Sequence, residues 1–456
     1  MRLILIIALL LSLLNNSCSK YLDEKRSAAD AVPTTIKDLQ ALLDDVTNMN
    51  QGDGGLDEAS ADDYFLTQTT FNSAAIIDIA RQTYLWQKPV YNYPNDYNDL
   101  YFPVYNSNLS LEVLENINRN SNNSSDWDNV KGSALFYRAY SFLRLAWTFS
   151  KSYDSTTANT DLGIPLKTSS NFNISSTRAS VKDTYEKIIS DLKDAALLLP
   201  TIPSHVIRPS KLAAYGALAR TYLSIRKYDS AYKYADLALK IKSALLDYSD
   251  TNKYLSSSTL PFTRYNDEVI FHSANFKGNS MSFALILPFF ATIDSTLYNS
   301  YNSNDRRKEL YFGLSTTGPF YKGMYSGSVN NPFTGIAVDE IILIKSESQT
   351  RLGNFNSGLD DLNTLLIKRY KKGTFVPYIA SSIEEALEII LSERRKELIY
   401  RDLRWADIKR LNKEGRNIIP KRIMGNQNYT LSPNDDKYAL PLPNDVINLS
   451  GMTQNP

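Results

Sequence analysis

Apolar and polar residues alternate along this chain with the three-to-four-residue period that is typical of amphipathic helices. A first helix is predicted over residues 34–46, where Thr35 can cap the first turn. Longer segments with the same period follow at residues 128–150, 176–200 and 381–411. The pattern therefore predicts a mainly α-helical protein.

The clearest repeated unit is the segment YGALARTYLSIRKYDSAYKYADLALK, residues 215–240. It places large and small residues at the offsets of a tetratricopeptide helical hairpin. The matching positions are Tyr215, Leu218, Ala219, Tyr222, Ala231, Ala235 and Ala238. A weaker copy spans residues 341–369. Its equivalent positions are Ile342, Ser346, Phe355, Gly358, Leu362 and Leu365. We therefore expect a tetratricopeptide-like scaffold of helical hairpins with long irregular loop insertions.

The insertion between the two hairpins, residues 244–337, is rich in Ser, Asn, Gly and Tyr and has little helical period. A loop-dominated stretch of this length is usually functional or disordered, and its scattered aromatic residues argue against disorder. Within it, DEVIFHSAN, residues 267–275, predicts a short buried strand, whereas FALILPFFATI, residues 283–293, is a short apolar run. The insertion separates an N-terminal helical region, residues 34–243, from a C-terminal helical region with an extended tail, residues 338–456.

The N-terminus carries a twelve-residue apolar run, LILIIALLLSLL, that is too short to span a bilayer but fits the core of a signal peptide. The chain's single cysteine, Cys18, follows a few residues later. This arrangement predicts a lipoprotein signal peptide over residues 1–17, acylation of Cys18, and a lipidated tether over residues 18–33. The alternative is an ordinary secretory signal that leaves Cys18 there by chance.

Composition excludes several classes of protein. The formal net charge is only +1, so electrostatics do not favour a nucleic-acid partner. One cysteine cannot form an intrachain disulfide or a zinc site, and His205 and His272 are the only histidines. The acidic, glycine-rich segment NQGDGGLDEASADD, residues 50–63, lacks the spacing of a calcium loop and is predicted to be a plain loop. We expect no metal and no cofactor.

Aromatic residues are densest in YLWQKPVYNYPNDYNDLYFPVY, residues 84–105, where Pro89, Pro94 and Pro103 argue against one continuous helix. Rings that stack on sugar faces, flanked by amide and carboxylate groups that bond hydroxyls, are the mix that a saccharide site needs. The ligand-binding candidates here are Tyr84, Trp86, Tyr91, Tyr93, Asn95, Asp96 and Tyr97. The candidates in the insertion are Tyr301, Tyr321 and Tyr325. Trp86 ranks first among them, and core packing is the alternative role for each ring.

The last helical segment carries many charges. Ser382 and Glu385 have the spacing of a capping box. Glu397 with Arg401, and Arg404 with Asp407, have the spacing of ion pairs along one helix. Interspersed acidic residues and Trp405 favour an ion-pair network at a helix junction over a nucleic-acid surface. Trp147 and Trp405 are predicted to lie in the core.

Taken in order along the chain, several segments resemble the SusD/RagB family of outer-membrane nutrient-binding lipoproteins. The first is Cys18 followed by Tyr21, Leu22 and Asp23. The next are YFPVYNSNLSLEVLENI, with Tyr101, Tyr105 and Asn108, and ALFYRAYSFLRLAW with its GIPL exit, through Arg138, Ala139, Tyr140 and Pro165. The helix containing Tyr185, Ile188, Asp191 and Leu192, the segment ERRKELIYRDLRWADIKR, and the ending LPLPNDVINLSGMTQNP complete the series. Arg401 and Asp402 depart from it, because the family usually has Glu-Gly there.

This resemblance implies a SusD-like fold in which a tetratricopeptide-like scaffold packs against a SusC-like TonB-dependent transporter of the outer membrane. Irregular loops on another face would bind a glycan or a peptide, and the protein would be no enzyme. The resemblance supplies no catalytic residue, and no ligand-binding residue can be transferred by motif.

Three other functions remain open from the residues. The protein could be a peptide-binding uptake lipoprotein of the same family, or a scaffold whose hairpins bind only protein. It could also be a glycoside hydrolase, which needs two carboxylates roughly 5–9.5 Å apart in a cleft. No particular pair of acidic residues in the sequence indicates such a site.

Overall fold

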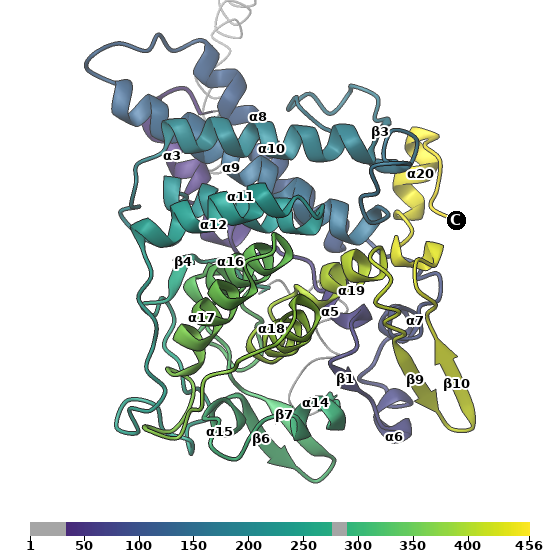
Figure 1. Ribbon diagram of the computed structural model, residues 1–456. Coiled ribbons are helices and arrows are strands. Elements are labelled where there is room, and N and C mark those ends of the chain that lie inside the picture. Colours follow the sequence, from purple (N-terminus) through teal and green to yellow (C-terminus); the bar gives the residue numbers. More distant parts are fainter. Residues whose placement is uncertain (1–32, 276–289) are drawn as a thin grey trace, which may run out of the picture.

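A computed structural model describes residues 33–275 and 290–456 of the chain (Figure 1). The predicted signal peptide, Cys18, nearly all of the tether and most of the apolar run at 283–293 lie outside these residues. The helices before the insertion are α3 (Ile36–Leu43), α4 (Val46–Met49), α5 (Leu56–Ser60), α6 (Gln68–Phe71), α7 (Asp78–Tyr84), α8 (Asp96–Glu115), α9 (Ser124–Phe149), α10 (Val181–Leu198), α11 (Lys211–Ser224) and α12 (Tyr228–Ile241). The later helices are α14 (Ser295–Asn299), α15 (Arg307–Tyr311), α16 (Val338–Arg351), α17 (Phe355–Leu366), α18 (Ile383–Glu397), α19 (Arg404–Asn412), the 3-10 helix η2 (Asp436–Tyr438) and α20 (Asn444–Ser450).

The described strands are short and pair only two by two, in antiparallel fashion. The pairs are β1 (Tyr64–Phe65) with β5 (Thr292–Ile293), β2 (Leu162–Pro165) with β3 (Arg178–Ser180), β4 (Val269–Phe271) with β8 (Ile336–Ala337), β6 (Phe312–Ser315) with β7 (Gly318–Tyr321), and β9 (Lys421–Met424) with β10 (Gln427–Thr430). The predicted strand at 267–275 is confirmed as β4. The mainly α-helical fold class is also confirmed.

The long helices form one continuous stack. Successive neighbours pack in the order α8, α9, α10, α11 and α12, and α12 then packs against α16 across the insertion. Helices α17 and α18 pack on α16 in turn, so the two predicted hairpins lie side by side although 96 residues separate Ile241 from Val338. Figure 1 shows this stack with the irregular part of the chain below it. Tertiary contact, rather than a fixed sequence period, makes the hairpins continuous.

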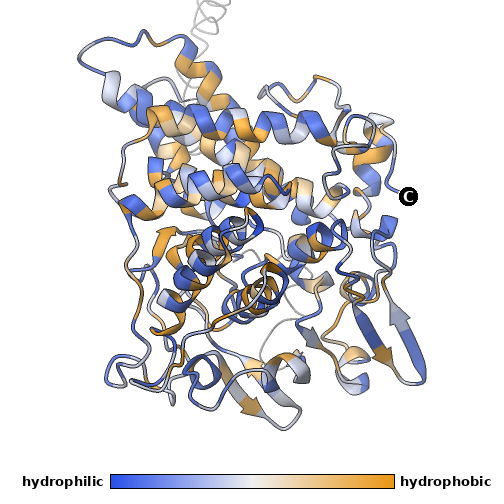
Figure 2. Ribbon diagram, viewed as in Figure 1, coloured by the Kyte–Doolittle hydropathy of each residue, from blue (hydrophilic) through white to orange (hydrophobic). Residues whose placement is uncertain are grey.

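Small residues at the hairpin contacts allow the helices to approach closely, as the repeat pattern predicts. Ala231, Ala235 and Ala238 of α12 are fully buried. In the second hairpin, Ser346 Oγ of α16 donates to the carbonyl of Gly358 in α17 at 2.6 Å. The helices carry apolar and polar stretches side by side along their length (Figure 2), as amphipathic helices do.

Helix α8 begins twelve residues before the helix predicted to resume at Asn108, and it contains Pro103. Residues 84–105 do not form one continuous helix, as predicted, but the interruption covers residues 85–95, and the part of the prediction that placed a break at Pro103 is wrong. A proline removes one hydrogen bond and crowds the preceding turn. Burial of the α8 residues Leu100 and Val104, both nearly inaccessible to solvent, provides packing energy that offsets this cost.

The irregular part of the chain has a second, largely aromatic core. It gathers side chains from residues 59–85 and from the insertion, including Tyr64, Tyr248, Phe262 and Tyr311. The acidic segment 50–63 lies beside it and is not a plain loop, because α5 forms within it. The N–H groups of Gly55 and Leu56 at the start of α5 donate to the carboxylate of Asp96 at 2.8 and 3.1 Å. A side chain 40 residues away thus caps this helix.

The charged residues of the last helices form an ion-pair network, but not with the predicted partners. Glu397 pairs with Arg307 and Arg369, at 3.0 and 2.7 Å, and not with Arg401. Arg401 instead reaches Asp339. The predicted local pair is wrong because buried charges need partners that share their burial, and these come from other segments.

The second predicted local pair and the capping box need similar corrections. Arg404 pairs with Asp62 rather than Asp407, since the start of α19 packs against α5. Ser382 caps α18 as predicted, but Glu385 bonds Ser381 instead of completing the box.

In the described parts of the chain, no helix combines the length and apolarity needed to cross a membrane.

Candidate functional site: an aromatic cleft beside helix α8

Three tyrosines of α8, Tyr97, Tyr101 and Tyr105, follow one another at intervals of four residues, so they lie along one face of the helix. The helix is fixed at its start by Asn95, whose side-chain oxygen accepts from the N–H groups of Tyr97 and Asn98. The rings of Tyr97 and Tyr101 are 4.7 Å apart between centroids. Tyr105 is 42% exposed, so this ladder of rings runs from the core out to the solvent.

The loop after β2, residues 166–177, forms the opposite wall, and α8 holds it by side-chain hydrogen bonds. Tyr101 Oη donates to the carbonyl of Pro165 at 2.7 Å. Asn108 Nδ2 donates to the carbonyls of Lys167 and Ser169 at 2.9 and 3.3 Å. The Glu112 carboxylate accepts from the Ser169 hydroxyl at 2.6 Å. These hydrogen bonds within the protein already hold the loop in place, so little ordering is left for a ligand to induce.

Between these walls lies a cleft of about 260 Å³. Its rings are those of the tyrosine ladder and of Phe172, which is 83% exposed on the loop. The polar residues that line it are Asn108, Lys167, Ser169, Ser170, Asn171 and Ser176. None of the described residues that line the cleft is acidic. The volume is slightly below the ~300–1,000 Å³ of typical small-molecule pockets, so the cleft suits one or two rings of a chain rather than a large ligand.

Burial controls the ionisation of groups around the cleft. It raises the pKa of the Tyr97 hydroxyl to about 12, so this group stays neutral and able to donate a hydrogen bond. Desolvation lowers the pKa of the Lys167 amine, which donates to the carbonyl of Ile174 at 2.7 Å. Burial also acts to raise the pKa of Glu112, but hydrogen bonds from Ser169 and Ser170 outweigh it and the pKa is lowered.

Most of the ligand candidates chosen from the sequence lie in the interior. The buried ones, none more than 6% exposed, are Tyr84, Trp86, Asn95, Asp96, Tyr97, Tyr301, Tyr321 and Tyr325. The hydroxyls of Tyr301, Tyr321 and Tyr325 donate to Lys396 O, Gly323 O and Glu268 Oε2. Apart from Tyr97, which lines the cleft, these rings are covered by neighbouring side chains, so a ligand could stack on them only if the core opened.

Trp86, the first choice from the sequence, is 2% exposed. Its Nε1 donates to the carbonyl of Ser60 at 3.0 Å, and the guanidinium of Arg422 lies 5.1 Å from the ring centroid. These contacts are those of a core residue, as also predicted and found for Trp147 and Trp405. Tyr91 is half-buried with a buried hydroxyl.

Two sequence candidates remain near a possible ligand. Tyr93 is 78% exposed, and Tyr97 lines the aromatic cleft. The sequence reasoning missed Tyr101 and Tyr105 as ligand candidates because the break predicted at Pro103 concealed their helical spacing. Phe172 had no sequence signal beyond being an aromatic residue in a segment rich in Ser and Asn.

The comparisons of this chain with known proteins agree on one family. Residues 20–223 match a family described as starch-binding and associating with the outer membrane, and residues 292–456 match the SusD family. No curated protein matches the sequence.

Among solved structures, a SusD superfamily protein from Bacteroides thetaiotaomicron aligns with a TM-score of 0.75 and 20% identity, covering 92% of this chain and 100% of the other. A SusD superfamily protein from Bacteroides fragilis aligns with a TM-score of 0.74 and 19% identity, covering 92% of this chain and 99% of the other. A SusD-like carbohydrate binding protein from Bacteroides vulgatus aligns with a TM-score of 0.70 and 20% identity, covering 92% of this chain and 97% of the other. At such identities the likeness shows a shared fold, and the two family matches together take in most of the sequence. The chain therefore belongs to the SusD/RagB family.

Proposed function

We propose that this protein binds an oligosaccharide or polysaccharide at the cell surface and delivers it to a SusC-like TonB-dependent transporter in the outer membrane. The observation that carries the binding part is the aromatic cleft. It presents Tyr105 and Phe172 to solvent beside amide and hydroxyl groups. Flat apolar rings next to hydrogen-bonding side chains fit the alternating C–H faces and hydroxyls of a sugar.

Family membership and a neighbour named as carbohydrate binding support a saccharide over a peptide ligand. The absence of acidic residues among the described side chains that line the cleft supports binding rather than glycoside hydrolysis there, since hydrolysis needs two carboxylates. The outer-membrane location rests on the family described as associating with that membrane, and the anchor on Cys18.

The proposal is tested by calorimetry and thermal-shift screening of the purified protein against plant, host and microbial glycans and against peptide pools. A ligand at 100 times its Kd adds about 2.7 kcal/mol of stability, which a melting curve detects easily. We expect one class of glycan to bind, and the double variant Tyr105→Ala/Phe172→Ala to weaken that binding about tenfold or more, through loss of ring stacking.

Phe102→Ala is the matched control, because Phe102 lies on the same helix, is 44% exposed and does not line the cleft. It should leave binding unchanged. Tyr93→Ala tests the most exposed ring of the aromatic stretch. Loss of binding in this variant alone would move the site away from the cleft. Binding of peptides but of no glycan would identify a peptide-uptake protein. Absence of binding to every glycan and peptide tested would favour a protein-binding scaffold.

A further inference from the structure

A second and larger cavity, of about 560 Å³, lies between the end of α16, the outer face of α18, and the turn that follows α19. Unlike the aromatic cleft, it combines charged side chains with an apolar floor. Arg351, Arg404 and Arg416 contribute three positive charges, and Glu384, Glu388 and Glu414 contribute three negative ones. The floor consists of leucine and isoleucine side chains, among them Leu387 and Ile418. Its volume falls within the ~300–1,000 Å³ of typical ligand pockets.

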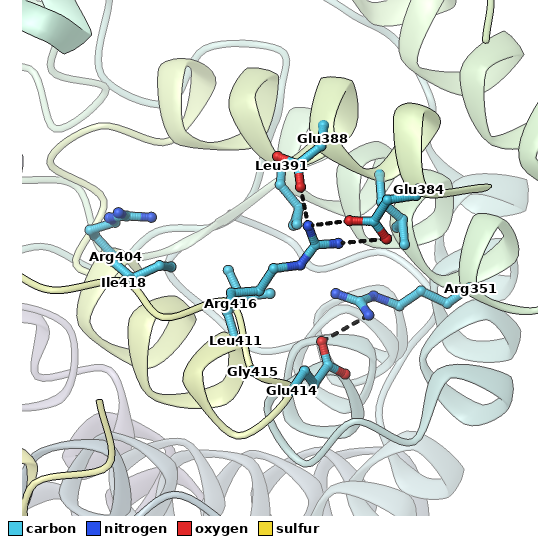
Figure 3. Close-up of a pocket in the computed structure, with 11 residues that line it drawn as sticks. Arg351, Glu384, Glu388, Leu391, Arg404, Leu411, Glu414, Gly415, Arg416 and Ile418 are labelled. Carbon is cyan, nitrogen blue, oxygen red and sulfur yellow. Dashed lines mark hydrogen bonds and ion pairs between the residues drawn. The ribbon is translucent and has the colours of Figure 1, made fainter. Parts of the chain in front are cut away.

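Arg351 has a donor without an acceptor at this cavity. Its Nε pairs with Glu347 at 2.9 Å, and its Nη1 pairs with Glu414 at 2.8 Å. Its Nη2 is buried and has no hydrogen-bond acceptor among the described residues, and the guanidinium lies 4.6 Å from the centroid of the Tyr228 ring. Figure 3 shows the guanidinium of Arg351 pointing toward Glu414 and Arg416 inside the cavity. An acceptor atom on a ligand would satisfy this nitrogen.

Arg416 is the second cation that faces the cavity, and its present partners are weakly held. It pairs with Glu384 and Glu388, whose side chains are 70% and 65% exposed (Figure 3). Exposed ion pairs contribute only about 0–1 kcal/mol, so a ligand could displace these glutamates from the guanidinium at little cost. Arg404 lies apart from Arg351 and Arg416 in Figure 3 and is paired with Asp62 at 2.6 Å.

We propose that this cavity binds a sugar acid, with the carboxylate held by Arg351 and Arg416 and the ring hydroxyls donating to the glutamates. A guanidinium matches a carboxylate in shape and charge. The glutamates provide acceptors for hydroxyl donors, and the apolar floor suits the C–H face of a ring. Because Arg351 and Arg416 already face glutamate side chains, a singly charged carboxylate fits better than a doubly charged phosphate monoester. This inference deepens the proposed glycan function by naming an acidic saccharide as a ligand at a separate site.

The test is calorimetry of the purified full chain in detergent with galacturonate, with galactose, and with inorganic phosphate. Galacturonate should bind, and added NaCl should weaken its binding because the contact is ionic. Galactose and phosphate should bind at least about tenfold more weakly than galacturonate, if at all. Equal binding of phosphate would overturn the assignment to a carboxylate. Absence of any galacturonate binding would overturn the site.

Variants of the two sides of the ion pair should have opposite effects, which a purely structural ion pair would not produce. Arg416→Gln should weaken galacturonate binding about tenfold. Glu384→Gln/Glu388→Gln should strengthen it about threefold, because the competing carboxylates are gone while their acceptor oxygens remain. Unchanged affinity in the double variant would overturn the proposal, even if Arg416→Gln failed to fold.

Two controls separate this site from the aromatic cleft. Arg119→Gln removes an arginine that also pairs with a carboxylate, that of Asp128 at 2.8 Å, but does not line the cavity, and it should leave galacturonate binding unchanged. Tyr105→Ala/Phe172→Ala should also leave it unchanged. If the cleft variant abolishes galacturonate binding, the ligand binds at the cleft and the charged cavity is not its site. If no glycan of the screen binds at the aromatic cleft but galacturonate still binds at the charged cavity, the cavity proposal holds and the cleft proposal fails.

Discussion

At the scale of single residues, the turn between α18 and α19 shows how a departure from the family pattern is accommodated. Asp402 adopts a φ of 58°, a left-handed conformation that favours glycine but that aspartate tolerates better than most residues. Its N–H donates to Glu58 Oε2 at 2.9 Å, and its carboxylate pairs with Arg144. The side chain thus provides a buried ion pair at a position where glycine would offer only backbone freedom.

Asp96 provides a residue-scale prediction about pH. Burial, reinforced by nearby Asp99 and Asp57, raises its pKa to about 7, despite the hydrogen bonds from Gly55 and Leu56. The unfolded value is about 3.9, so the folded state holds an extra proton between roughly pH 4 and 7, and this group makes the protein less stable as pH rises through that range. Asp96→Asn keeps the acceptor oxygen and removes the charge. We expect the melting temperature of the variant minus that of the parent protein to be more positive at pH 8 than at pH 5.

Asp128→Asn is the control for this measurement, because the pKa of Asp128 is lowered, first by its hydrogen bond from Arg119. A carboxyl group whose pKa is lowered by folding stabilises the protein at every pH above its pKa in the unfolded chain. Asp128→Asn should therefore lose a little stability at both pH 5 and pH 8. A melting-temperature difference for Asp96→Asn that is the same at pH 5 and pH 8 would contradict the assigned charge state.

At the scale of elements, close helix contact in the second hairpin outweighs helix propensity. A Cβ built on Gly358 would lie 1.9 Å from Thr350 Oγ1 and 2.8 Å from the carbonyl oxygen of Ser346, both on α16. In an open helix, alanine would be favoured over glycine by about 1 kcal/mol. Here Gly358→Ala must push α17 away from α16, and we expect it to destabilise the protein by about 1–3 kcal/mol in urea unfolding.

Ser357→Ala is the matched control, since Ser357 is the preceding residue of the same helix and is exposed. This change should leave stability unchanged or raise it by a few tenths of a kcal/mol, because alanine is the better helix former. Equal stability of the two variants would show that α16 and α17 do not approach each other as closely as the structure has them.

At the scale of the whole molecule, buried ion pairs connect parts of the chain that are far apart in sequence. Arg369, just after α17, pairs with Glu268 before β4 and with Glu397 of α18. Arg307 of α15 pairs with the same Glu397. Removal of one partner from such a pair leaves an uncompensated buried charge, so the network specifies how the insertion lies against the helical stack.

The proposed membrane anchor also belongs to the scale of the whole molecule, and it yields a prediction. Acyl chains on Cys18 would contribute about 0.8 kcal/mol for each buried methylene, and the described helices offer no spanning segment. Cys18→Ala should therefore move the protein from the outer-membrane fraction to the soluble one, as followed by fractionation and immunoblotting. Ser17→Ala, which keeps a small residue before the cysteine, should stay with the membrane. Continued membrane association and acylation of Cys18→Ala would refute the lipid anchor.

The sequence by itself determined most helices, the two hairpins and the core tryptophans, because these depend on local period and on small residues at fixed spacing. It also carried the family resemblance. It did not determine which aromatic residues reach solvent, or which arginine meets which carboxylate. Trp86 is covered by Arg422, and Glu397 bonds Arg307 rather than Arg401, through contacts between segments far apart in the chain. Such long-range packing decides which side chains are buried and which charges pair. It also stabilises α8 as one helix across Pro103, and this places the tyrosines of the aromatic cleft along one helix face.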